Sequence, residues 1–215
     1  MGKIILVVIA IVLLLIAVAA YLVYQSMMKG PDLSQFEYLL EPRITTLEDQ
    51  QVIEVVAAGD PNTAGKNAFG LLFKAYFKTR GAPKGPNQSP PRARWPEDLS
   101  IPKDQWVGRY AMVVPQGVTE LPQVDAPEGV TVSLTTWEYG EVAEILHIGP
   151  YDKEQPTMEK LKAFVAEQGY ETFGPHEEEY LKGPTMFSAG DPAKYCTILR
   201  YRVRKAAPEE PPSEE

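Results

Sequence analysis

Residues from about 44 to 205 carry the same order of predicted elements twice, and this repetition limits the possible folds more than any other feature. In each copy an apolar run typical of a strand precedes an amphipathic helical stretch and two further strand-like runs. The order β-α-β-β, repeated, predicts an α+β domain with two helices on a largely antiparallel sheet. Two such pseudo-repeats leave a cleft between them, a natural site for a small molecule.

The first pseudo-repeat covers about residues 44–115. Its opening strand is expected at 51–56, and the corner Gly59-Asp60-Pro61 supplies an N-cap and a residue suited to the first helical position. Apolar residues then recur with the spacing of one helical face at Phe69, Leu72, Phe73 and Tyr76. Two more strands are expected at 92–95 and 107–114.

The second pseudo-repeat covers about residues 130–205. Asp152 and Gln155 have the spacing of a capping box at the start of its helix. The apolar face of that helix consists of Met158, Leu161 and Val165. Strands are expected at 130–137, 141–148, 177–181 and 197–203.

Two stretches of the second copy are distinctive in their letters. The corner Gly149-Pro150-Tyr151 follows an apolar strand, and Glu178-Glu179-Tyr180-Leu181 follows the helix and precedes Pro184. In this order they resemble the GyrI-like small-molecule-binding domain, the effector-binding fold of the DNA gyrase inhibitor and of AraC-type and multidrug-sensing regulators. The likeness spans about residues 44–205, and its first half matches in pattern more than in letters. No helix-turn-helix segment accompanies it here, so we do not expect a one-component transcription factor.

The resemblance implies a pocket between the repeats, walled by aromatic rings, with a carboxylate near its centre. By motif match the carboxylate is Glu178 and its companion is Tyr180. A carboxylate buried alone is costly, so a cationic ligand would compensate it, and aromatic faces would add about 0.5–2 kcal/mol of cation–π attraction. The candidate wall residues are Trp95, Trp106, Tyr110, Trp137, Tyr139 and Tyr151. Strand alternation places Glu177 and Glu179 on the opposite face, which we expect to be solvated.

Three functions remain open at this point. The first is non-catalytic binding of a hydrophobic, cationic small molecule, as a sensor or for sequestration. The second is hydrolysis of a reactive small molecule with Glu178 as general base, if burial raises its pKa towards neutrality. The third is an interaction scaffold whose cleft is filled by its own side chains, with a protein partner that the sequence does not identify.

The N-terminal region contains 21 consecutive apolar or aromatic residues, Ile4 to Tyr24. As a helix this run would be about 30 Å long, the thickness of the hydrocarbon part of a bilayer. Residues 1–30 are therefore expected to be a single-pass transmembrane anchor, followed by a linker at 31–43. A cleaved signal peptide is the alternative, because Ala17-Val18-Ala19 resembles a cleavage site, but the run is longer than a usual signal core. Lys3 on one side slightly favours a domain outside the cytoplasm.

Charge and reactive side chains exclude several classes of protein. The net charge of the chain is −8. Without Lys3, Lys29 and the four Glu of segment 206–215, the remaining body of the chain has a net charge of −6. Such a body is not a generic basic nucleic-acid binder. With one Cys and two His, neither a disulfide framework nor a metal site is expected, and we predict no cofactor. His147, His176 and Cys196 are interpreted as core or surface residues, and the Pro- and Glu-rich segment 206–215 as a disordered acidic tail.

Overall fold

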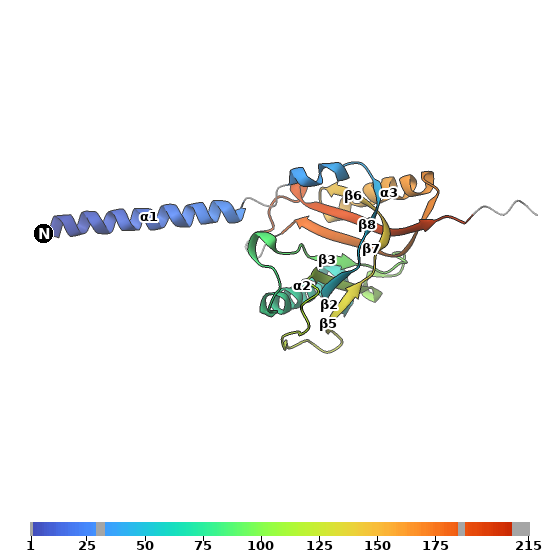
Figure 1. The fold of residues 1–215 in the computed structure, drawn as a ribbon, viewed down its shortest axis with the longest axis horizontal. Coiled ribbons are helices and arrows are strands. Elements are labelled where there is room, and N and C mark those ends of the chain that lie inside the picture. The colour runs from blue at the N-terminus through green and yellow to red at the C-terminus, as the bar shows by residue number, and fades with distance from the viewer. Residues whose placement is uncertain (1, 29–32, 185–187, 208–215) are drawn as a thin grey trace, which may run out of the picture. The chain divides into compact units, whose positions relative to one another are not determined.

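The computed structural model describes residues 2–28, 33–184 and 188–207 (Figure 1). The chain divides into two compact units, Met1–Gln35 and Phe36–Glu215. The anchor, linker and tail predictions fall partly on residues 1, 29–32 and 208–215, which lie outside the described residues.

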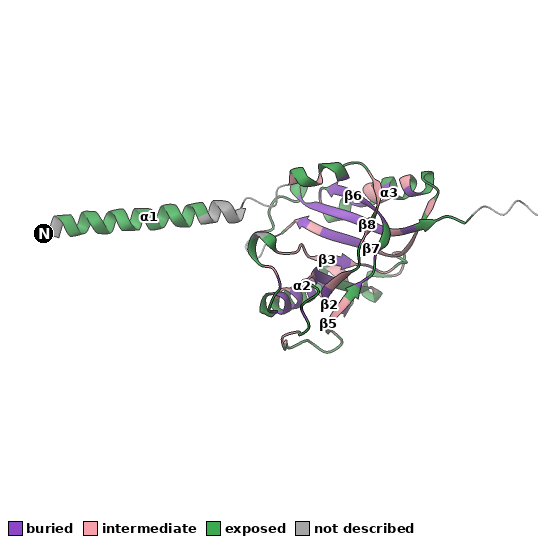
Figure 2. Cartoon of the chain, in the orientation of Figure 1, coloured by how far each residue is buried: buried purple, intermediate pink, exposed green. Residues whose placement is uncertain are grey.

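The first unit consists mainly of helix α1 (Gly2–Met28). Its segment Ile4–Leu22 has a mean hydropathy of 3.4, and the side chains of that segment are exposed (Figure 2). By length and composition it is apolar enough to cross a membrane. A signal sequence shares this property, so the helix is compatible with both alternatives.

The second unit combines helices with an eight-stranded sheet in which every pairing is antiparallel. The helices are α2 (Pro61–Lys78) and α3 (Gln155–Glu167). The strands are β1 (Arg43–Leu47), β2 (Gln50–Ala58), β3 (Arg92–Arg94), β4 (Val107–Val113), β5 (Thr131–Trp137), β6 (Gly140–Ile148), β7 (Tyr170–Lys182) and β8 (Cys196–Lys205). Short 3₁₀ turns, such as Leu33–Leu39 and Tyr151–Lys153, occur between them.

The mixed helix and antiparallel sheet architecture is confirmed. The order β-α-β-β occurs as β2-α2-β3-β4 and again as β6-α3-β7-β8; an internal duplication stays a prediction. The sequence analysis missed β1 and gave β7 too short a range, because β7 begins at Tyr170. Its pairing with β8 is irregular between Phe173 and Glu177, around Gly174 and Pro175, which obscures the alternation there.

The starts of the two helices differ in how well they were predicted. Asp60 is the N-cap of α2, and its Oδ1 accepts a hydrogen bond from the backbone N–H of Asn62 at 2.8 Å, as expected. The capping box at Asp152 is wrong, because the helix begins at Gln155 and its N-cap is Glu154, whose side chain makes no capping bond. Asp152 lies in the preceding 3₁₀ turn.

The sheet is strongly curled. Its strand order is β1-β6-β8-β7-β3-β4-β2-β5, so β1–β2 and β5–β6 link opposite ends of the sheet. Only residues 48–49 and 138–139 separate these strands. Since a chain advances at most about 3.6 Å per residue, the two ends must approach one another. One face of the sheet is thus enclosed by the curl, and the other is available to the helices.

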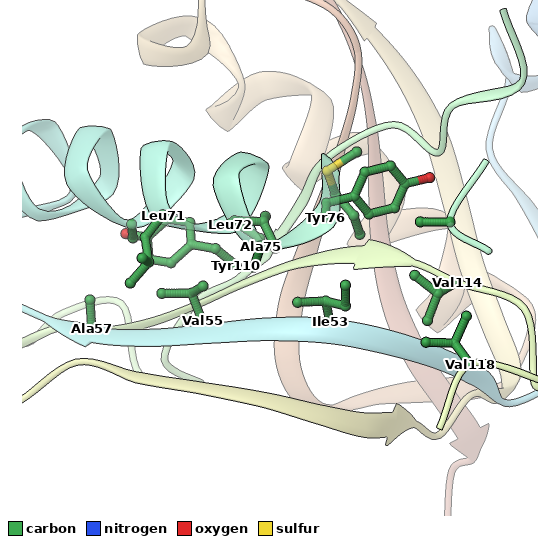
Figure 3. Packing of buried hydrophobic residues seen from close by; sticks show 14 of the residues in the cluster. Ile53, Val55, Ala57, Leu71, Leu72, Ala75, Tyr76, Tyr110, Val114 and Val118 are labelled. Atoms are coloured by element: carbon green, nitrogen blue, oxygen red, sulfur yellow. The ribbon is translucent and has the colours of Figure 1, made fainter. Parts of the chain in front are cut away.

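Both helices cover the same face of the sheet. Leu72 and Tyr76 of α2 belong to one apolar cluster with Val55 of β2 and Tyr110 of β4 (Figure 3). Leu161 and Val165 of α3 pack on the β6 and β8 side chains Ala143, Ile145 and Leu199. These two apolar clusters leave the middle strands β7 and β3 between them, and that is where the candidate site lies.

Candidate functional site

The pairing register places Glu178 midway between the two helices. Residues directly opposite one another on neighbouring strands share a face. One such row crosses the sheet through Val55, Tyr110, Ala93, Glu178, Leu199 and Ile145. Val55 lies under α2 and Ile145 under α3. Glu178 is therefore a carboxyl in the middle of an otherwise apolar and aromatic row.

The Glu178 side chain is surrounded by hydrogen-bond donors and rings. The residue is 8% exposed, and its Oε2 accepts a hydrogen bond from the hydroxyl of Tyr180. The indole of Trp95 also donates to the carboxyl. His176 Nε2 lies 3.8 Å from Glu178 Oε1. Burial raises the pKa of Glu178, and the donors Tyr180 and Trp95 offset part of that rise.

Aromatic rings form a connected wall beside Tyr180. Phe69 of α2 and Tyr151 of the 3₁₀ turn approach its ring edge-on, with centroids at 5.7 and 5.4 Å. Phe69 also contacts Tyr110 at 4.9 Å, and Tyr110 contacts Trp95 at 5.7 Å. The structure thus brings together four of the predicted ligand-binding residues, Trp95, Tyr110, Tyr151 and Tyr180, and adds Phe69, which the sequence analysis assigned only to a helix face.

A second buried carboxyl, Glu154, belongs to the same neighbourhood. It precedes α3, is 4% exposed, and its carboxyl interacts with the carboxyl of Glu178. Its Oε1 makes no hydrogen bond, and the Thr197 hydroxyl lies beside the carboxyl. Burial, together with the neighbouring Glu178, raises the pKa of Glu154 well above its usual range. The sequence analysis missed Glu154, since it lies in the polar stretch Asp152–Gln155 and no motif singles it out.

The other titratable groups of the site are held neutral. Burial, with a smaller effect from Glu178, raises the pKa of Tyr110 and of Tyr201 to about 12. Burial lowers the pKa of His176 to about 4, and its ring stacks on Tyr201 at 5.2 Å. Their hydroxyls and imidazole therefore carry no charge at neutral pH.

The second histidine has structural contacts. His147 Nδ1 lies 2.9 Å from the Thr157 hydroxyl, and its Nε2 lies 3.2 Å from the Pro150 carbonyl oxygen. Cys196 is buried at the start of β8. Within the described ranges of the chain, no group of three or more His, Cys, Asp and Glu side chains is arranged to hold a metal ion.

The expectation of a solvated face at Glu177 and Glu179 is wrong. Both are buried on the enclosed face of the curl. Glu177 lies 2.6 Å from Arg200 Nη1 and 2.9 Å from Arg94 Nε, and Glu179 lies 3.1 Å from Arg92 Nη2. Glu144 completes the network at 3.0 Å from Arg200. Arg92 and Arg94 alternate along β3 as Glu177 and Glu179 do along β7. This matching pattern of basic and acidic residues was the sequence signal that could have indicated a buried ionic network.

Trp137 and Tyr139 belong to this enclosed face and not to the neighbourhood of Glu178. The Trp137 indole donates to Glu54 Oε1 at 2.7 Å, and Arg94 lies 4.1 Å above its ring. The Tyr139 hydroxyl donates to Glu177 at 3.0 Å. The ring of Trp106 contacts that of Trp95, with centroids 5.8 Å apart.

Two cavities lie away from Glu178. A groove of about 570 Å³ runs beside β1 and the end of α3, and a cavity of about 90 Å³ lies against the ionic network. Neither is lined by Glu178 or Tyr180. The rings beside the central carboxyl contact one another, with centroids 4.9–5.7 Å apart.

The family model described as the GyrI-like small molecule binding domain matches residues 40–195. The chain belongs to the GyrI-like family. The resemblance in the sequence is thereby confirmed, and the GyrI-like domain is one that binds small molecules. No curated protein matches this GyrI-like chain significantly.

Solved structures share the GyrI-like fold at low identity. A hydrolase from Listeria innocua has a TM-score of 0.63 at 22% identity, over 80% of this chain and 96% of that one. The C-terminal domain of EcmrR has a TM-score of 0.52 at 14% identity, over 77% and 98%. EcmrR in an EcmrR–DNA complex has a TM-score of 0.55 at 13% identity, over 90% and 65%. These likenesses concern the fold alone.

Proposed function

We propose that this GyrI-like chain binds a hydrophobic, cationic small molecule at Glu178 and Tyr180, without turning it over. One observation carries the proposal: within the described part of the chain, no Lys or Arg forms an ion pair with Glu178, although the residue is buried. Its neighbours Glu177 and Glu179 both have arginine partners. A buried carboxyl without such a partner favours a ligand that brings the missing positive charge.

The surroundings of Glu178 favour a large, apolar cation. The rings of Phe69, Trp95, Tyr110 and Tyr151 supply flat apolar surface on the helix-covered face. A quaternary or delocalised cation gains cation–π attraction from such rings and loses little hydration on entry. A small, strongly hydrated cation gains less, so we expect the site to prefer lipophilic cations.

Ligand entry requires the aromatic wall to move, and Tyr151 is the residue through which we expect it to open. Tyr151 is 36% exposed, and it bridges the rings of Tyr180 and Tyr195 at 5.4 and 5.1 Å. It lies on a short 3₁₀ turn that begins directly after Pro150. A rotation of this one side chain would expose Tyr180 and the carboxyl beneath it.

Binding by the full-length chain in a nonionic detergent tests the proposal. Tetraphenylphosphonium and tetraphenylborate have the same shape and opposite charge, so calorimetry with both separates charge recognition from apolar partition. We expect the phosphonium to bind, the borate not to bind, and Glu178→Gln to weaken phosphonium binding by about tenfold or more. Glu167→Gln, at an exposed position on α3, is the matched control. Absence of binding across a panel of lipophilic cations would refute the proposal.

Hydrolysis is the second candidate, and the raised pKa of Glu178 favours it. A buried carboxyl of this kind can act as a general base on water, with the Tyr180 hydroxyl polarising a substrate oxygen. The protein from Listeria innocua with a similar fold is described as a hydrolase. Turnover of a strained or electrophilic substrate, detected as product by mass spectrometry and abolished in Glu178→Gln while binding persists, would decide for it.

An interaction scaffold is favoured by the close packing of the aromatic wall. If no small molecule binds and the ring contacts of Tyr151 and Tyr180 persist in solution, the site is a filled core. Nuclear Overhauser contacts between these two rings, measured with and without a tenfold excess of cation, distinguish a filled core from an opening wall.

Two further proposals concern the whole chain. Residues 1–30 are a single-pass anchor for the domain at 44–205, supported by the hydropathy of α1. The domain contains two pseudo-repeats, supported by the strand order, in which β6-β8-β7 mirrors β2-β4-β3 about the centre of the sheet. Superposition of residues 44–115 on 130–205 in a crystal structure tests the second of these.

A further inference from the structure

We infer that Glu154 is a second carboxyl of the ligand site, held protonated against an ionised Glu178, so that the empty site carries one negative charge and gains another by releasing that proton. The site would then accept dications with proton release and monocations without it. The inference rests on the proposed function and specifies the charge of the ligands that the site takes.

The geometry brings the two carboxyls together from different parts of the fold. Glu154 ends the 3₁₀ turn before α3, and Glu178 lies in the middle of β7. Both residues are buried, and their carboxyl groups interact with one another. If the two carboxyls share one proton, the protonated Glu154 donates a hydrogen bond and the Glu178 carboxylate accepts it.

Several buried polar atoms at the same place lack hydrogen-bond partners. They are Glu154 Oε1 and both ring nitrogens of His176. Unpaired buried polar atoms are costly and therefore uncommon. Their concentration around one carboxyl pair indicates a site shaped for a polar or charged group of a ligand.

The groups that face the pair bring no positive charge. Tyr180 and His176 come from β7, Tyr110 from β4, Thr197 and Tyr201 from β8, Trp95 from the position after β3, and Tyr151 from the turn before α3. All of these are neutral at pH 7, and the positive charge of Lys162 acts on His176. Two carboxylates cannot both remain ionised in such surroundings.

The proton balance of binding follows from this arrangement. A monocation pairs with the Glu178 carboxylate while Glu154 keeps its proton. A dication pairs with both carboxylates, and the proton of Glu154 passes to solvent. Dication affinity therefore rises with pH below the titration of Glu154, by up to about tenfold per pH unit for one proton, whereas monocation affinity stays nearly constant.

Calorimetry on the full-length chain, in two buffers of different ionisation enthalpy, tests the inference. The probes are benzyltriphenylphosphonium and its dicationic counterpart p-xylylenebis(triphenylphosphonium). We expect release of about one proton with the dication and almost none with the monocation. Glu154→Gln should abolish proton release and the gain in dication affinity with pH, and still bind the monocation. Glu154→Asp, which retains a carboxyl, should keep proton release.

A ligand-free measurement separates failure of this inference from failure of the proposed function. Infrared spectroscopy of the full-length chain at pH 7 should show a protonated carboxyl C=O band that Glu154→Gln and not Glu167→Gln removes. If that band is absent, or if the dication binds without proton release, the inference is overturned even though cations bind. If the band is present and no cation binds, the carboxyl pair stands and the ligand proposal fails.

Discussion

Glu177, Glu178 and Glu179 are consecutive in the sequence and lie in opposite electrostatic surroundings. The two outer residues point to the enclosed face and pair with Arg92, Arg94 and Arg200. Glu178 points to the helix-covered face, where aromatic rings and hydroxyls replace the arginines. The alternation of a strand thus converts a run of three acidic residues into one structural network and one binding group.

Two substitutions on this strand should have unequal consequences for stability. Glu177→Gln removes the acidic partner of Arg94 and one of the partners of Arg200, which keeps Glu144 and Glu179. It should lower the free energy of unfolding by about 3–5 kcal/mol. Glu178→Gln removes a carboxyl that has no arginine partner and should change it by less than about 1 kcal/mol. Urea denaturation of the three proteins measures both. Equal losses at the two positions would contradict the assignment of their roles.

Stability should also depend on pH above neutrality. The pKa of Glu154 is raised from 4.5 to about 9, chiefly by burial. Between these values the unfolded chain has lost the proton that the folded chain keeps, so a rise in pH favours unfolding. From pH 7 to 9, above the titration of His176, the free energy of unfolding should fall by up to about 1.4 kcal/mol per pH unit. Urea denaturation across this range should show a flatter profile for Glu154→Gln.

The sequence identifies some residues of the candidate site and not others, and the difference has a physical cause. The ordered motif identifies Glu178 and Tyr180 as a pair, and strand alternation places them on one face. Glu154 could not be found in this way, because its approach to Glu178 depends on how a turn meets a strand far along the chain. In the sequence Trp137 and Trp95 are equally good candidates for the wall of the site. The strand order, which the sequence does not reveal, places Trp137 on the enclosed face.

At the scale of elements, apolar periodicity predicted the helices and most strands, because their buried faces repeat with the period of the element. It failed for β1 and for the first part of β7. Strand β1 is a short edge strand with mostly half-buried side chains, so its pattern is weak. The first part of β7 contains a Gly-Pro pair and an irregular register, which interrupt the alternation.

Helix α2 contains two glycines that offer a matched test of how it packs on the sheet. A Cβ at Gly70 would meet no atom within 4 Å, whereas a Cβ at Gly65 would lie 3.2 Å from the Tyr110 hydroxyl. Gly70→Ala should therefore raise the free energy of unfolding by about 0.5–1 kcal/mol. Gly65→Ala should show a smaller gain or a loss, and should also weaken cation binding by displacing Tyr110. Thermal unfolding and calorimetry measure these effects, and an equal gain at both positions would argue against the packing.

For the whole molecule, the open question is whether α1 holds the domain at a membrane or is a signal sequence. If residues 1–30 are an anchor, the full chain should remain in the membrane pellet after alkaline carbonate extraction, and deletion of residues 2–28 should release it. The intact mass of the membrane-bound chain distinguishes an anchor from a cleaved signal, since cleavage after Ala19 removes the apolar segment. Protease treatment of sealed vesicles reports on which side the domain lies.

The curl of the sheet also determines how the chain must fold. Arg43 pairs opposite Glu144, Gln50 opposite Trp137, and Arg92 opposite Glu179. Such pairings give the domain a high contact order, and domains of this kind fold slowly because long loops must close before contacts form. During synthesis, the strands made first therefore cannot complete their pairing until most of the domain has left the ribosome. Until then, their hydrogen-bonding edges are exposed to other chains.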